Sequence, residues 1–296
     1  MIVDAHTHVF PPKVIEQRER IAAVEPAFAE IYGDGRARMA TADELLASMA
    51  EAGVDVSVVC NFAWRDEGLV DHTNAYILDA AARSGGRLVP FVSVYFPPDA
   101  GAHGRADTEE APQTAKADVR AAIRALASAG ARGIGELRPE QSGYDLGNSD
   151  EADLLNWAAS AFDLALLIHA TEPVGHQYAG KAGGPLDPIV RFAASAAGVT
   201  VIAAHWGGGL PFYTLMPEVR EALATTHFDT SAGHLLYEPR VYRAAIELVG
   251  VERILWASDW PLTSQAKALA RLDAAGLSPA ERTAIAGENA ARLLRL

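Results

Sequence analysis

Short apolar runs of strand length alternate along most of the chain with longer segments of helical periodicity. The apolar runs predict eight β-strands, over residues 3–9, 54–61, 88–95, 133–138, 164–169, 199–205, 227–231 and 253–259. The amphipathic segments predict helices over residues 41–53, 69–83, 116–129, 150–162, 188–197, 216–225, 240–249, 264–275 and 279–294. This alternation predicts a parallel sheet, and the count of eight strands predicts closure into an α/β (β/α)8 TIM barrel. An open doubly wound sheet is the competing topology, but its Gly-x-Gly-x-x-Gly turn after the first strand is absent.

The connection after the first strand is the one irregular feature of this pattern. Residues 10–40 contain Pro11, Pro12, Pro26 and a Gly-Asp-Gly turn signal, and they exceed an ordinary connection between a strand and a helix. Such insertions are often lids or binding loops. Thr41 and Glu44 have the spacing of a capping box and predict where the first regular helix begins. We therefore expect one barrel domain over residues 1–296, with residues 10–40 as an insertion or lid.

The composition of the chain limits the kinds of molecule that the protein is expected to bind. Half of the 296 residues are hydrophobic, and the formal net charge is −13, which argues against a nucleic-acid or anionic-membrane surface and favours a small-molecule substrate. The single cysteine, Cys60, excludes an internal disulfide and a thiolate metal cluster, and is interpreted as a buried apolar residue. No apolar run reaches the length of a membrane span, and the first strand leaves no room for a signal peptide. We expect a cytoplasmic protein, and a homo-oligomer is compatible with the sequence.

Histidines and carboxylates stand at the predicted ends of several strands. His6 and His8 share one face of the first strand because side chains alternate with a period of two. Asp4 shares that face, where a carboxylate could orient a histidine ligand. The carboxyl ends of barrel strands converge on one pocket. The set at those ends is His6, His8, Glu136, His169, His205 and Asp259. The residues two steps deeper, Leu167, Ala203 and Ala257, are apolar, as expected of side chains that fill the barrel interior.

Each of these residues also has an ordinary structural interpretation. His169 or His205 alone could be a hydrogen-bonded core histidine, and Asp259 could cap the following helix. Glu136 could pair with Arg138 on the same face. A divalent metal ion at a catalytic site explains all six residues together, because imidazole and carboxylate are its usual ligands. The glycines at 207–209 fit either an anion site or a tight connection, and a tight connection is favoured.

The ordered motifs resemble the amidohydrolase superfamily, specifically the amidohydrolase-2 branch related to aminocarboxymuconate-semialdehyde decarboxylase. They are Asp4-Ala-His-Thr-His8, Leu167-Ile-His-Ala170, Ala203-Ala-His-Trp-Gly207, Trp256-Ala-Ser-Asp-Trp-Pro261 and Asn289-Ala-Ala-Arg-Leu-Leu294. The resemblance implies that His6, His8, His169 and Asp259 bind a metal, usually zinc, with manganese as the alternative. It also implies that His205 assists catalysis.

Glu136 departs from the single-metal decarboxylases and resembles the strand-four glutamate that TatD-like hydrolases use with two metals. Arg138, a fixed cation on the same face, opposes a second positive ion. We therefore expect one tightly held ion with Glu136 beside it. A second metal, with Glu136 as a ligand, is the alternative.

The leading functional hypothesis is a metal-dependent hydrolase of a small, carboxylated molecule. Asp259 would take a proton from metal-activated water, and His205 would stabilise the developing oxyanion. A non-oxidative decarboxylase or other lyase on the same site is the runner-up. A metal-free binding protein and a TatD-like nuclease are further alternatives, the second disfavoured by the acidic composition. Candidate substrate contacts in the loops are Trp64, Arg65, Arg138, His176, Tyr178, Lys181 and Trp206.

Overall fold

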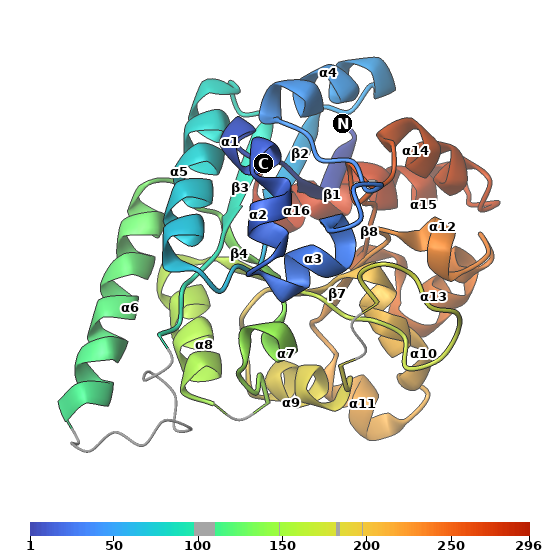
Figure 1. Cartoon of the computed structure of the whole chain (residues 1–296). Coiled ribbons are helices and arrows are strands. Elements are labelled where there is room, and N and C mark those ends of the chain that lie inside the picture. Colours follow the sequence, from blue (N-terminus) through green and yellow to red (C-terminus); the bar gives the residue numbers. More distant parts are fainter. Residues whose placement is uncertain (98–109, 148, 182–183, 197) are drawn as a thin grey trace.

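The computed structural model describes residues 1–97, 110–147, 149–181, 184–196 and 198–296. These residues contain an eight-stranded parallel sheet in the order β1 to β8 (Figure 1). Its strands are β1 (Val3–His8), β2 (Val56–Cys60), β3 (Leu88–Val92), β4 (Gly133–Leu137), β5 (Ala165–Ile168), β6 (Val201–Ala203), β7 (His227–Asp229) and β8 (Ile254–Leu255). Most strands are shorter than predicted, and β5, β6 and β8 end before His169, His205 and Asp259.

The first and last strands join through backbone hydrogen bonds. Ala5 N–H donates to Trp256 O at 3.0 Å, and Asp259 N–H donates to His6 O at 3.0 Å. His8 N–H donates to Trp260 O at 2.7 Å. The predicted (β/α)8 barrel is therefore confirmed. Closure also brings Asp259 beside the His6–His8 pair, although more than 250 residues separate them along the chain.

Helices surround the sheet, and the long predicted helices are present with small shifts at their ends. They are α4 (Ala42–Ala52), α5 (Glu67–Arg83), α6 (Glu110–Ser128), α8 (Asp150–Phe162), α9 (Asp187–Ser195), α11 (Pro217–Ala222), α13 (Val241–Val249) and α14 (Gln265–Asp273). The predicted end of α9 at residue 197 lies outside the described residues. The helix expected over 279–294 consists of α15 (Pro279–Thr283), a π-helical turn (Ala284–Glu288) and α16 (Asn289–Leu294). Short helices α7 (Pro139–Ser142), α10 (Leu210–Tyr213) and α12 (Gly233–Leu236) were not predicted.

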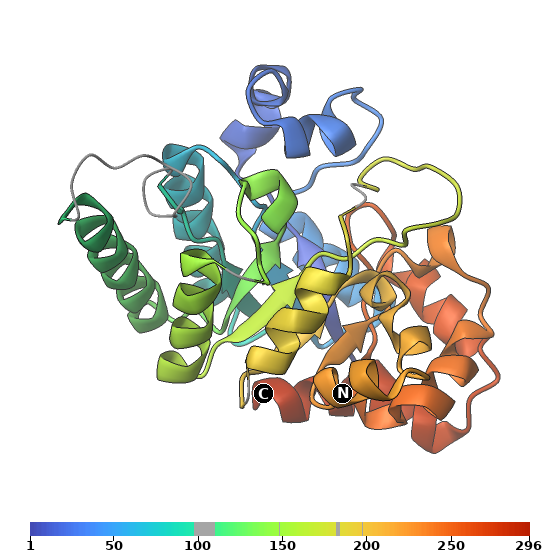
Figure 2. The same ribbon diagram turned by 90° about the horizontal axis from the view of Figure 1, so that it is seen from below.

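The segment after β1 forms three short helices, α1 (Pro12–Glu16), α2 (Arg18–Ala22) and α3 (Pro26–Tyr32). Figure 2 shows them at one end of the molecule, with both chain termini at the opposite end. They pack around an aromatic cluster in which the rings of Phe28 and Tyr32 lie 4.9 Å apart. The carboxylate of Glu25 accepts hydrogen bonds from the backbone N–H groups of Arg65 and Asp66 and so ties this segment to the loop after β2. The insertion is confirmed as structure, and its role as a lid stays a prediction.

Apolar side chains fill the barrel below its polar rim. Leu167 and Ala257 lie in the inner cluster, as the alternation of side chains predicts, and Cys60 is buried there as expected. Ala203 was also expected inside the barrel, but it packs in the outer layer between sheet and helices. The expectation was wrong because β6 ends at Ala203, so the period of two cannot be extended to His205. Across the described ranges, no helix is both long and apolar enough to cross a lipid bilayer.

The chain turns sharply after β6 through a run of left-handed residues. His205, Trp206, Gly207 and Gly208 have φ angles of 56°, 57°, 59° and 60°. This conformation costs little only for glycine. A Cβ at Gly208 would lie 2.6 Å from the carbonyl oxygen of Thr171. The glycines therefore form a tight connection, as favoured, and they allow the backbone to place His205 at the barrel rim.

We expect Gly208→Ala to lower the free energy of unfolding by about 2–4 kcal/mol, because it combines backbone strain with a steric clash. Gly85→Ala is the matched control: its φ is 65°, and a Cβ there would meet nothing within 4 Å. The control should cost only the backbone strain, about 1–2 kcal/mol. Urea unfolding of both variants checks this, and equal losses would contradict the steric argument.

Candidate active site

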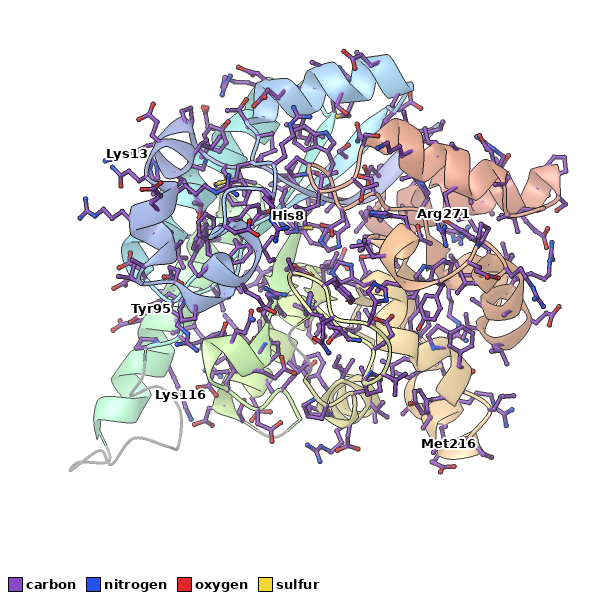
Figure 3. The ribbon with its side chains drawn as sticks, turned by 45° about the vertical axis from the view of Figure 1, so that its right-hand side comes forward. His8, Lys13, Tyr95, Lys116, Met216 and Arg271 are labelled. Atoms are coloured by element: carbon purple, nitrogen blue, oxygen red, sulfur yellow. The ribbon has the colours of Figure 1, made fainter. Side chains whose placement is uncertain are left out.

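Two buried histidines from β1 form the centre of the site. The Nε2 atoms of His6 and His8 lie 2.9 Å apart. His6 Nδ1 lies 2.9 Å from Asp229 Oδ2, and His8 Nδ1 lies 3.1 Å from the carbonyl oxygen of Cys60. These contacts orient both rings so that their Nε2 atoms face the same point. In Figure 3, His8 lies near the middle of the molecule.

Asp4 does not orient a histidine ring, so that expectation was wrong. Its carboxylate accepts hydrogen bonds from Ser258 N–H at 2.9 Å, Ser258 Oγ at 2.6 Å and Gln265 Nε2 at 2.9 Å. Burial raises the pKa of Asp4 to about 6, although these donors partly offset the effect. Asp4 instead fixes the backbone beside Asp259.

Two carboxylates from distant parts of the sequence lie near the histidine pair. Asp259 Oδ1 lies 3.7 Å from His8 Nε2 and 4.0 Å from His6 Nε2. Glu136 Oε2 lies at the same two distances from these nitrogens. Two sets of potential ligands result within the described residues, His6–His8–Asp259 and His6–Glu136–His205.

The donor set fits a divalent cation. Atoms that share one such ion at about 2 Å lie about 3–4 Å apart, as these do. The negative charges around the site also favour a bound cation, because the carboxylates of Glu136, Asp229 and Asp259 surround His6. Burial opposes protonation of His6, yet these carboxylates raise its pKa to about 10. A divalent ion would replace that proton.

His169 faces Glu136 and Arg138 and belongs to neither ligand set. Its Nδ1 lies 2.7 Å from Glu136 Oε1, and its Nε2 lies 3.0 Å from Arg138 Nη2. Burial and the adjacent guanidinium lower the pKa of His169 to about 3, so the ring is neutral. To bind the ion, His169 would have to give up one of these contacts. Its role as a ligand stays a prediction.

His205 is held by contacts on both ring nitrogens. Its Nε2 lies 3.1 Å from Glu136 Oε1, and its Nδ1 lies 2.8 Å from Ser231 Oγ. Asp229 accepts the backbone N–H groups of His205 and Ser231, each at 3.0 Å. Burial opposes the protonated form, but Glu136 outweighs it and raises the pKa of His205. His205 can therefore hold a proton at the rim of the barrel.

Asp229 and Ser231 are the residues that sequence analysis missed. Asp229 orients the His6 ring and also fixes the backbone of His205, which makes it the residue that joins the two halves of the site. The signal was present: both residues lie at the end of the seventh apolar run, the position that marked the other candidates. The same reasoning about strand ends would have included them.

The histidines and carboxylates of this site form a histidine–carboxylate cluster, and most of them line a small cavity of about 50 Å³. Polar walls come from the histidines, Glu136, Arg138 and Asp259, and apolar walls from the loops. The lining residues are His8, Ile31, Phe62, Glu136, Arg138, His169, Tyr178, Ala179, Gly180, His205, Ala232, Leu235, Asp259 and Leu262. The helix α3 thus contributes Ile31 to the wall, and the loop after β5 contributes Tyr178.

The predicted substrate contacts divide into two groups. Arg138 and Tyr178 line the cavity. His176 is exposed, and Lys181 donates to the carbonyl oxygens of Val174 and His176 at 2.6 and 3.0 Å, which uses its ammonium to hold the loop. Trp206 is buried against Tyr242, with ring centroids 4.9 Å apart. None of these three lines the cavity, and their role as substrate contacts stays a prediction.

Enzymes with a (β/α)8 barrel have their active site at the carboxyl ends of the strands. This chain gathers histidines and carboxylates at that position. The family model Amidohydro_2, described as amidohydrolase, matches residues 3–296. The chain therefore belongs to this family and is an enzyme of the amidohydrolase superfamily, as the motifs predicted. A search of curated proteins finds no significant match.

Solved structures share this fold at low sequence identity. 5-Carboxyvanillate decarboxylase from Sphingomonas paucimobilis has a TM-score of 0.75 and 18% identity, covering 100% of this chain and 99% of that chain. A dihydroxybenzoic acid decarboxylase from Polaromonas sp. JS666, with bound manganese and the inhibitor 2-nitroresorcinol, has a TM-score of 0.71 and 16% identity, covering 100% and 97%. A 2,6-dihydroxybenzoate decarboxylase in complex with 2,6-dihydroxybenzoate has a TM-score of 0.70 and 17% identity, covering 100% and 99%.

Proposed function

We propose that this enzyme is a metal-dependent, non-oxidative decarboxylase of small carboxylated aromatic compounds. This was the runner-up hypothesis from the sequence, and it now stands ahead of hydrolysis. The observation that carries it is Arg138, a fully buried arginine whose Nε and Nη1 atoms have no hydrogen-bond partner in the described structure. Within the described residues its hydrogen bonds are made through Nη2, to Gly180 O at 2.9 Å and to His169 Nε2 at 3.0 Å.

A guanidinium of this kind is suited to a substrate carboxylate. Paired N–H donors of arginine bind a carboxylate in a bidentate arrangement, and leaving them buried without an acceptor is unfavourable. The apolar walls at Phe62, Leu235 and Leu262 suit a ring beside that carboxylate. Carboxylated aromatic compounds are also the substrates named for the three decarboxylases of similar fold.

The side chains that line the cavity can supply the proton that decarboxylation requires. The bond between the ring carbon and the carboxylate breaks, its electron pair stays on that carbon, the carbon takes a proton, and carbon dioxide leaves. We assign this proton to Oδ2 of Asp259, because Oδ1 faces the two histidines. His205, protonated at Nε2 and held by Glu136, stabilises negative charge on the substrate.

His6, His8 and Asp259 would hold the metal, with Glu136 beside it. A bound divalent ion would polarise the substrate oxygens and offset negative charge as it develops. Zinc and manganese both suit two imidazoles and carboxylates. The manganese in the Polaromonas structure makes manganese a candidate equal to the zinc expected from the family resemblance.

We expect anomalous diffraction at a metal absorption edge to give one peak, between His6, His8 and Asp259. Oε1 of Glu136 already accepts from His169 and His205, so Oε2 alone faces the His6–His8 pair. Two peaks about 3.5–4 Å apart, the spacing of two-metal sites, would instead make Glu136 a bridging ligand.

Arg138→Gln tests the substrate class. Once a substrate is found, this variant should raise its KM at least about tenfold, because a charge-assisted hydrogen bond is lost, and should change kcat much less. Arg83→Gln, which removes an exposed arginine paired with Asp79, is the control and should behave as wild type. An unchanged KM for every carboxylated substrate would remove Arg138 from the binding site.

Hydrolysis and decarboxylation are separated by product analysis. The metal-loaded protein is incubated with 2,6-dihydroxybenzoate, with 5-carboxyvanillate and with a panel of aryl esters and lactones. Carbon dioxide from a carboxylated compound supports the proposal. Hydrolysis of an ester or lactone with no carbon dioxide from any carboxylated compound would return the assignment to a hydrolase that uses metal-activated water.

A further inference from the structure

A second cavity lies beside the catalytic one, between the segments that follow β7 and β8. Its volume is about 150 Å³, and Ala232 and Leu262 line both cavities. Three basic side chains line it: His234 from α12, and Lys267 and Arg271 from α14. Figure 3 shows Arg271 on the side of the molecule formed by the C-terminal elements, to the right of His8.

The charge of this second cavity contrasts with the rest of the protein. The chain carries a net charge of −13, yet no aspartate or glutamate is among the residues that line this cavity in the described part of the chain. Burial lowers the pKa of His234, and the nearby Arg271 and Lys267 lower it further against the opposing effect of Asp259. The positive charge of this cavity therefore comes from Lys267 and Arg271, and an anion bound in the cavity would be attracted to both.

Two buried donors without acceptors lie beside Gly233, a residue that lines this second cavity. Arg271 Nε and Trp206 Nε1 have no hydrogen-bond partner in the described structure. A Cβ built on Gly233 would lie 3.6 Å from the first and 3.1 Å from the second, so both donors converge beside this glycine. Unpaired buried N–H groups are rare in folded proteins and call for an acceptor. Thr263 Oγ1, which lies 3.2 Å from His234 Nδ1, adds a polar group to the same space.

We propose that this basic cavity binds an oxyanion, a carboxylate or a phosphate, separately from the histidine–carboxylate cluster. In (β/α)8 barrels the loops after strands seven and eight often form a phosphate site, which agrees with the position. The oxyanion has two potential sources. It is either a second acidic group of the substrate, reaching past Ala232 and Leu262, or an independent small anion.

Isothermal titration of the metal-loaded protein with inorganic phosphate tests the proposal. Phosphate should bind, and Arg271→Gln should weaken binding at least about tenfold, because it removes a charged donor. Gly233→Ala should weaken it comparably while keeping every charge, since the new methyl group fills the space beside the two donors. Arg220→Gln, which removes an exposed arginine from α11, should leave binding unchanged.

Two outcomes would overturn the proposal. Phosphate could bind with equal strength to all four proteins, which would assign the binding to the metal, or it could fail to bind at millimolar concentration.

Competition then identifies the source of the oxyanion. If phosphate weakens binding of benzene-1,3-dicarboxylate but not of benzoate, the oxyanion belongs to the substrate. If phosphate binds alongside both, it is an independent ligand. These measurements report binding alone, so they stand whether the enzyme is a decarboxylase or a hydrolase.

Discussion

Asp259→Asn is expected to lower turnover by at least about 10²-fold, because it removes the group that we assign to proton transfer. The protein should remain folded. Asp259 lies at the rim with φ of 63°, a left-handed conformation that asparagine tolerates nearly as well as aspartate. Steady-state turnover and circular dichroism of the metal-loaded variant measure the two effects separately.

Asp163 provides a matched control for this substitution. It also has a positive φ, 54°, but lies on the surface paired with Arg295, at the opposite end of β5 from His169. Asp163→Asn should keep wild-type turnover. If Asp259→Asn retains near-normal turnover as well, Asp259 has only a structural role in the local turn, where its carbonyl oxygen accepts from Leu262 N–H at 2.9 Å.

His6→Ala should abolish both metal retention and activity. His6 is common to the two ligand sets, and its Nε2 is the donor nearest to His8. Loss of one ligand from so few leaves the ion open to water and unpairs Asp229. Metal content after dialysis, measured by elemental analysis, should fall from about one ion per chain to near zero.

The control for His6→Ala is an exposed histidine on α5. His72→Ala removes an exposed imidazole that does not line the cavity and should retain the metal. A His6→Ala protein that holds as much metal as wild type would place the ion elsewhere, and the argument from the paired Nε2 atoms would fail.

The barrel and most of its rim could be predicted from the sequence because they depend on local periodicity. Eight apolar runs determined the strand count, and polar residues at the ends of five of these runs marked His6, His8, Glu136, His169, His205 and Asp259, which the structure brings together. The capping box at Thr41 and Glu44 is present as predicted. These features need no knowledge of how distant segments pack.

What could not be predicted depends on long-range geometry. Asp4 shares a face with His6, but closure of the barrel brings Ser258 to its carboxylate and leaves His6 to Asp229. The left-handed turn at His205 breaks the alternation on which Ala203 was assigned to the barrel interior. The ammonium of Lys181 donates its hydrogen bonds to carbonyl oxygens of its own loop, and the pattern of polar positions does not reveal such a contact.

Proton incorporation during decarboxylation tests the central claim most directly. The metal-loaded protein is incubated in D2O with 2,6-dihydroxybenzoate or 5-carboxyvanillate, and the product is analysed by mass spectrometry and NMR. We predict release of carbon dioxide and one deuterium at the carbon that carried the carboxylate, with both lost after removal of the metal by a chelator. Unchanged carboxylated substrates, together with hydrolysis of an ester or lactone by the same metal-loaded protein, would contradict the account.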